Sequence, residues 1–302
     1  MAFTAKDVMK LREKTGCGMM DCKKALTEAD GDMDRAIDVL REQGLAKAAK
    51  KASRIAAEGV AFAMTNDDKT AGVAIEVNAE TDFVAKNAEF QAFVKTVAET
   101  VMAEKPADVE ELLTKTAVGT SATVAELLQE KIQTIGENII IRRFKFFDGN
   151  VAAYVHMGGK ISVLVKFDTD VAGTDGFAEY AKDMAMQIAA ANPLYMTKED
   201  VPEDVIEHEK KIMTEQVVNS GKPANVAEKI VMGKIGKYYE ENCLLFQSFI
   251  KDNKATVEQY TKQKAKELGG KIEIVDFVRF EKGEGLEKRS DDFAAEVASM
   301  VK

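Results

Sequence analysis

Residues 138–147, NIIIRRFKFF, and residues 271–282, KIEIVDFVRFEK, are two similar apolar segments that decide the fold. Their β-branched and aromatic residues predict strands. Each closes a passage that begins with two shorter strands and a helix. The shorter strands are expected at residues 60–64, 72–78, 151–157 and 161–167. The pattern predicts two related ββα…β units, at residues 59–148 and 149–283.

The two passages also match in detail. Phe90 and Phe177 occupy similar places at the start of the helix in each passage, and IRRF at 141–144 resembles FVRF at 277–280. A duplicated unit explains these matches, and two independent passages of the same kind are the alternative. The second passage contains extra charged, helical sequence at residues 198–268, which we expect to project as a helical arm.

The first 45 residues predict a head of three short helices. Thr4, with Asp7 three residues later, is the expected cap of the first helix, and Asp21 that of the second. Gly44 fits the position just after the third. Residues 46–58 predict a basic linker, and residues 284–302 predict a C-terminal module with an amphipathic helix at 291–300. The expected fold class is therefore α+β.

Composition narrows the class of protein. The chain has 302 residues, a formal net charge of −9 and no Trp. No apolar run is long enough to span a bilayer, and the charged start carries no apolar core of a secretory signal. The three cysteines, Cys17, Cys22 and Cys243, are an odd number that predicts reduced thiols. We therefore expect a cytoplasmic protein that does not bind a membrane.

Motifs of enzymes and metal sites are missing from the sequence. The two histidines, His156 and His208, are far apart, and no CxxC or HExxH occurs. No Gly-Lys pair has the upstream glycine and the following Ser or Thr of a phosphate-binding loop. Residues 16–21, GCGMMD, fall one residue short of GxGxxG and do not follow a strand. We expect no catalytic residues, no metal and no cofactor.

Two segments are unusual for a plain globular domain. Adjacent Met19 and Met20 lie in a glycine-flanked turn, where either at least one is exposed for binding or one plugs the head core. Phe83 lies where a strand ends and a helix begins, with Thr81 or Asp82 as the expected cap. Phe83 could pack inward as a staple or point outward as an anchor for a partner.

Several motifs together resemble the bacterial elongation factor Ts family. They occur in the family's order and cover nearly the whole chain: TGCGMMDCKKAL, GDMDRAIDVLR, EVNAETDFVAKNAEF, IGENIIIRR, NPLYMTKEDVP, SGKP, CLLFQSF and FEKGEGLEK. One departure is Gln247-Ser248-Phe249, where members often have Gln-Pro-Phe. Another is Cys17, where a small residue such as Ala is common.

The resemblance implies a protein partner and no reaction on a small substrate. Members are guanine-nucleotide exchange factors of elongation factor Tu, and their head is similar to a ubiquitin-associated domain. By analogy Leu11, Met19 and Met20 would contact the partner's G domain. The TDFV motif would disturb the partner's magnesium site, and a third segment would meet its distal domain. The TDFV motif consists of Thr81, Asp82, Phe83 and Val84. The third segment consists of His156, Met157 and Gly158.

The resemblance also implies that the arm at residues 198–268 is a helical hairpin, which some members use to form a homodimer. A second hypothesis is a translation factor that binds RNA directly. Its basis is residues 46–54, which contain Lys47, Lys50, Lys51 and Arg54 and no acidic residue. The acidity of the remaining chain speaks against direct contact with nucleic acid. An α+β metabolic enzyme is a third hypothesis, which the missing motifs disfavour.

Overall fold

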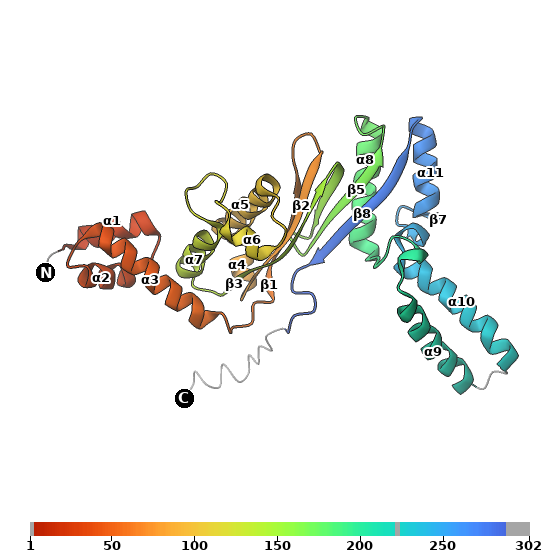
Figure 1. Ribbon diagram of the computed structural model, residues 1–302, viewed down its shortest axis with the longest axis horizontal. Coiled ribbons are helices and arrows are strands. Elements are labelled where there is room, and N and C mark those ends of the chain that lie inside the picture. Colours follow the sequence, from red (N-terminus) through yellow and green to blue (C-terminus); the bar gives the residue numbers. More distant parts are fainter. Residues whose placement is uncertain (1–2, 221–223, 288–302) are drawn as a thin grey trace.

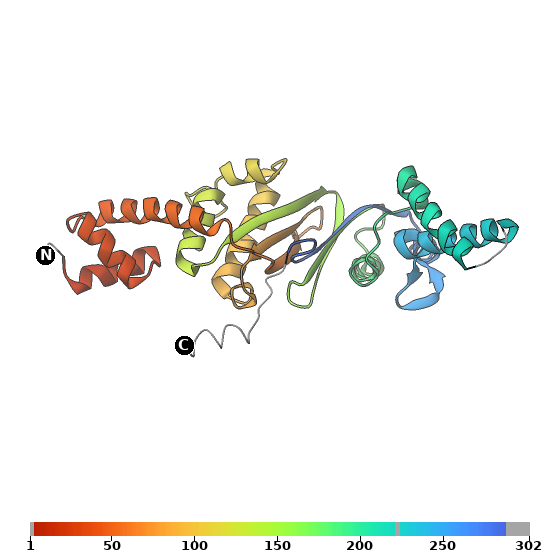
Figure 2. The same ribbon diagram turned by 90° about the horizontal axis from the view of Figure 1, so that it is seen from below.

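The computed structural model describes residues 3–220 and 224–287. It is an elongated molecule in which a helical head and a helical arm lie at opposite ends, with two small sheets between them (Figures 1 and 2). The α+β class expected from the sequence is confirmed. No helix in the described ranges combines the length and apolarity needed to cross a bilayer.

The head consists of α1 (Ala5–Thr15), α2 (Met19–Glu28) and α3 (Met33–Lys51) around a small apolar core. The capping box of Thr4 and Asp7 is confirmed. Asp21 does not cap α2, because that helix begins two residues earlier, after Gly18. The Asp32 side chain caps α3.

Helix α3 does not end at Gly44, contrary to expectation, but continues to Lys51, inside the expected linker. Gly44 lies against α7 (Val124–Ile135), where an added Cβ would come within 2.6 Å of the Gln133 side chain. A side chain at this position would require the flexible end of Gln133 to move. Tertiary packing thus extends α3 beyond a residue that often ends helices.

The first unit is an antiparallel sheet with helices on one face. The strands are β1 (Glu58–Thr65), β2 (Ala71–Ala79) and β3 (Ile139–Asp148), in the order β1-β2-β3. Between β2 and β3 the chain forms α4 (Asp82–Ala85), α5 (Ala88–Glu104), α6 (Val109–Thr114) and α7. Phe90 and Val97 of α5 are fully buried against this sheet.

The second unit repeats this plan. Its strands are β4 (Asn150–His156), β5 (Ile161–Thr169) and β8 (Ile272–Glu281), in the order β4-β5-β8. Its helices α8 (Asp175–Ala191) and α11 (Val257–Leu268) pack on one face. Phe177 of α8 is buried in this core, in the role that Phe90 has in the first.

The lengths and irregularities of the elements support a duplication. The pairs α5 and α8, α7 and α11, and β3 and β8 have 17, 12 and 10 residues per member respectively. A bulge leaves Arg142 of β3 and Val275 of β8 without a register partner. Aligning these bulges pairs residues 141–144 with residues 274–277, so the expected match to residues 277–280 is wrong.

The two sheets pack face to face, which gives four layers: helices, sheet, sheet and helices. Small and apolar side chains fill the interface: Ala61, Ala63, Ala74, Phe147, Val151, Leu164 and Phe280. A Cβ on Gly72 would lie 2.6 Å from Leu164. The fully buried Glu76 accepts hydrogen bonds there from Arg142, Arg143 and the Gly283 N–H.

The arm is a helical hairpin of α9 (Glu203–Asn219) and α10 (Ala224–Asn242). Short elements connect it to the second unit: η1 (Lys198–Asp200), η2 (Leu244–Phe246), β6 (Ser248–Phe249) and β7 (Asp252–Thr256). The expected arm, residues 198–268, extends too far because α11 belongs to the second core. The amphipathic helix expected at residues 291–300 lies outside the described residues.

Candidate partner-binding site

The turn after β2 presents one aromatic side chain to solvent. Thr81 caps the single turn of α4 by accepting a hydrogen bond from the Val84 N–H at 3.4 Å. Val84 points into the first core and is 8% exposed, whereas Phe83 is 81% exposed. Phe83 is therefore not a core staple, and the outward alternative describes its position. An exposed aromatic side chain on an ordered turn is typical of a protein-binding anchor.

Asp82 lies beside Phe83 as a fixed negative charge. Asp82 is the first residue of α4 and does not cap it, and its carboxylate accepts a hydrogen bond from Lys86 Nζ at 2.6 Å. This hydrogen bond, together with the positive charges of Lys86 and Lys282, lowers the pKa of Asp82 below its ordinary value. Asp82 consequently stays ionised at neutral pH.

Glu137, just before β3, holds the turn through hydrogen bonds from its side chain. Its Oε2 accepts hydrogen bonds from the N–H groups of Glu80 and Thr81, both at 3.0 Å, and its Oε1 accepts one from the Thr81 hydroxyl at 2.6 Å. The Glu80 carboxylate in turn accepts a hydrogen bond from the Asn138 N–H at 2.6 Å and pairs with Arg54. Segments that are far apart in the sequence thus fix the backbone that carries Phe83.

Glu137 was not among the site residues expected from the sequence. Its only signal was membership of the IGENIIIRR motif, which says nothing about contact with Thr81. Glu137 and Thr81 meet only because β2 and β3 are neighbours, with Ala79 opposite Ile139. Only a correct prediction of the pairing between β2 and β3 would have identified Glu137 as a partner of Thr81.

The head exposes part of its expected contact set. Met19 and Met20 lie in the first turn of α2 and are 40% and 64% exposed. Leu11 is fully buried in the head core, so the expectation of a direct contact through its side chain is corrected. Cys17 and Cys22 are also buried in this core, and burial raises the pKa of the Cys22 thiol.

The third expected segment forms the tip of the β4–β5 hairpin. Met157 is 71% exposed and has a left-handed backbone with φ of 49°. Such a conformation is strained for a residue with a side chain, and strain of this kind often marks a binding site. Gly158 follows with φ of 63°, and half-buried His156 contacts the Tyr154 hydroxyl through Nδ1 at 2.9 Å.

Two of the three expected contact regions lie at one edge of the paired sheets. Lys282 connects them: its N–H donates to the Lys160 carbonyl at 2.9 Å, and its ammonium group pairs with Glu58. The same ammonium group is among the charges that act on Asp82. The Gly159 carbonyl at the hairpin tip accepts a hydrogen bond from the Ala61 N–H at 2.8 Å, and Glu58 lies opposite Ala79, just before the Phe83 turn. Met19 and Met20 belong to the head, which lies at one end of the molecule (Figure 1).

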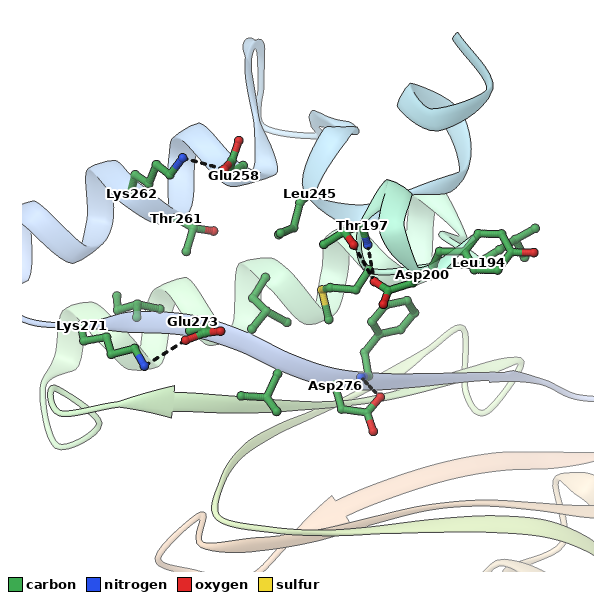
Figure 3. Close-up of a pocket in the computed structure, with 16 residues that line it drawn as sticks. Leu194, Thr197, Asp200, Leu245, Glu258, Thr261, Lys262, Lys271, Glu273 and Asp276 are labelled. Carbon is green, nitrogen blue, oxygen red and sulfur yellow. Dashed lines mark hydrogen bonds and ion pairs between the residues drawn. The ribbon is translucent and has the colours of Figure 1, made fainter. Parts of the chain in front are cut away.

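Two hollows of the surface lie away from these residues. One, of about 860 Å³, runs between β8 and α11, and another, of about 950 Å³, is lined by residues of the head and of α7. In the first, Lys262 pairs with Glu258 and Lys271 with Glu273 (Figure 3). Within the described ranges, no three His, Cys, Asp or Glu side chains gather as a metal site would need.

Comparison with known proteins places the chain in a family. A family model described as Elongation factor TS matches residues 80–284, which include Phe83, Glu137 and the hairpin tip. Proteins named Elongation factor Ts from Syntrophotalea carbinolica and Trichlorobacter lovleyi are 51% and 50% identical over 100% of this chain and at least 99% of their own length. One from Clostridium botulinum is 49% identical over 99% of each chain. The chain belongs to the elongation factor Ts family.

Proposed function

We propose that this chain is the guanine-nucleotide exchange factor of elongation factor Tu and carries out no covalent chemistry of its own. The observation that carries the proposal is the 81% exposed Phe83 on a turn held by Val84 beneath it and by Glu137 beside it. A rigid aromatic group of this kind suits a partner's pocket better than it suits solvent. Family membership over the full length supports the same partner.

The mechanism follows from linkage between two binding events. An exchange factor that binds the nucleotide-free partner more tightly than the GDP-bound partner must weaken GDP binding by the same factor. Phe83 would occupy a pocket that opens only when the partner's magnesium site is deformed. A hot-spot aromatic side chain contributes about 2–4 kcal/mol in such a pocket. The ionised Asp82 would add a fixed charge beside it.

The other exposed segments would hold the two proteins together. Met19 and Met20 would contact the partner's G domain, and flexible methionine side chains adapt well to such surfaces. The tip around Met157 and Gly158, with His156 behind it, would meet a distal domain of the partner. Met19→Ala/Met20→Ala should weaken the complex without unfolding the head, because neither side chain belongs to the head core.

Direct RNA binding is disfavoured by the contacts of the basic stretch. Lys51 donates a hydrogen bond to the Ile132 carbonyl at 3.2 Å, and Arg54 pairs with Glu80 at 3.3 Å. These cations brace the head and the Phe83 turn against the first unit, which leaves fewer for phosphates. We expect a cytoplasmic protein, and the arm of α9 and α10 remains a candidate surface for a homodimer.

Release of fluorescent GDP from elongation factor Tu tests the proposal. Small amounts of this protein should accelerate release many-fold, with no hydrolysis of GTP by the protein alone. Unchanged release over a wide concentration range would contradict the proposed function. A salt-titrated RNA binding assay on the same preparation would detect the alternative, since phosphate contacts weaken steeply with salt.

A further inference from the structure

Each unit of the core has an equivalent hydrogen bond at the start of its closing strand. In the first unit the Asn138 N–H, just before β3, donates to the Glu80 carboxylate at 2.6 Å. In the second unit the Lys271 N–H, just before β8, donates to the Asp170 carboxylate at 2.6 Å. This contact ties the chain after the middle strand to the start of the closing strand, so it serves the fold in both units.

The two units differ at the residue just before Asn138 and Lys271. In the first it is Glu137, whose carboxylate accepts three hydrogen bonds from Glu80 and Thr81. In the second it is Gly270, where an added Cβ would lie 2.3 Å from Asp170 Oδ1 and 2.4 Å from Val171 Cγ1. The second unit thus folds its equivalent turn without any side chain at this place.

The connections that follow the middle strands also differ. The first unit uses residues 80–87 and adds the turn of α4 with exposed Phe83, whereas the second reaches α8 through residues 170–174. One helical turn is not stable by itself. The cap from Thr81 to the Val84 N–H is long, at 3.4 Å, and the same hydroxyl donates to Glu137 at only 2.6 Å. The hydrogen bonds to Glu137 therefore occur only in the unit that contains the turn of α4 and Phe83.

We infer that Glu137 is the positioning residue of the exchange reaction: it holds the Thr81 backbone and hydroxyl so that Phe83 projects in its binding-competent direction. This inference rests on the proposed function. Phe83 is largely free of packing, so its direction depends on the backbone at Thr81 and on Val84 beneath it. A preorganised turn avoids the cost of ordering Phe83 during binding.

A double-mutant cycle between Glu137 and Phe83 tests the inference. GDP release from elongation factor Tu is measured with the full chain as wild type, Glu137→Ala, Phe83→Ala and the double variant. Glu137→Ala should slow exchange about fivefold to tenfold in the wild type but less than about twofold in the Phe83→Ala background, because it acts through Phe83. Equal slowing in both backgrounds would contradict a positioning role.

Two further variants separate positioning from general stability. Glu137→Gln keeps a carbonyl oxygen that can accept both N–H bonds, so it should recover most of the exchange rate. Asp170→Ala removes the carboxylate of the matching contact in the second unit, and it should lower the melting temperature without slowing exchange per folded molecule. If Asp170→Ala slows exchange as much as Glu137→Ala does, the inference fails.

The outcomes also distinguish this inference from the proposed function. If Phe83→Ala exchanges at the wild-type rate, the role of Phe83 fails first. If Phe83→Ala is slow but Glu137→Ala is normal, only the positioning role of Glu137 is overturned. A protein that never accelerates GDP release overturns the function itself.

Discussion

The first and second units of the core have the same strand order, the same bulge in the closing strand and matching helices, yet only the first presents an exposed aromatic residue after its middle strand. Phe90 and Phe177 are buried at equivalent positions in the two cores. Phe83 and Glu137 have no such counterparts, since the second unit has a shorter turn and Gly270. Shared features support packing, and the differences mark where function was added.

A second contrast concerns how the units are held together. Glu76 on β2 is fully buried, and its carboxylate accepts hydrogen bonds from Arg142, Arg143 and the Gly283 N–H, which follows β8. At the matching place on β5, opposite the second bulge, lies half-buried Lys166. The second unit therefore has no counterpart of this buried carboxylate at the matching position.

The largest expected effect concerns the matching aromatic side chains of the two cores. Phe90→Ala and Phe177→Ala should each lose about 3–5 kcal/mol of unfolding free energy, because both remove a buried ring. Since the sheets share an interface, both should lower one common transition in thermal denaturation. Two separate transitions, each sensitive to one variant, would show that the units fold independently.

The next effect tests the asymmetry at the sheet interface. Glu76→Ala should lose about 3 kcal/mol, because it leaves Arg142 and Arg143 without their buried partner. The matched variant Lys166→Ala should change stability by less than about 0.5 kcal/mol. Urea denaturation of the full chain measures both losses, and similar values for the two would remove this contrast.

The smallest effect should be equal in the two units. Thr123 and Thr256 form capping boxes with Glu126 and Gln259 at the start of α7 and α11. Thr123→Ala and Thr256→Ala should each lower the free energy of unfolding by about 1 kcal/mol, because each leaves a backbone N–H in the first turn of its helix without the capping hydroxyl. Serine at either place should restore stability. A clear inequality between the two alanine variants would weaken the equivalence of α7 and α11.

The sequence predicted local features well and contacts between distant segments poorly. Strand positions, the equivalent places of Phe90 and Phe177 and the cap at Thr4 follow from local pattern. Helix α3 continues through Gly44 to Lys51 and packs against α7, and no local rule contains that contact between distant segments. The assignment of α11 to the second core likewise depends on its contact with α8 and β8.

The candidate site divides in the same way. An unusual Phe83 at a strand end and paired methionines after a glycine were visible in the sequence, but their direction was not. Leu11 shares the helical pattern of a core residue and proved to be one. Glu137 was not predicted as a site residue because its role depends on strand pairing, which brings residues 80–81 beside residues 137–138.

The central claim, that Phe83 is an exposed anchor for exchange and not part of the core, is tested most directly by Phe83→Ala. GDP release and thermal melting are measured on one preparation, with Val118→Ala as the control for loss of an exposed apolar side chain. We predict exchange slower by about tenfold or more, as each lost 1.4 kcal/mol is one decade, with the melting temperature nearly unchanged. A large fall in melting temperature with normal exchange per folded molecule would contradict the claim.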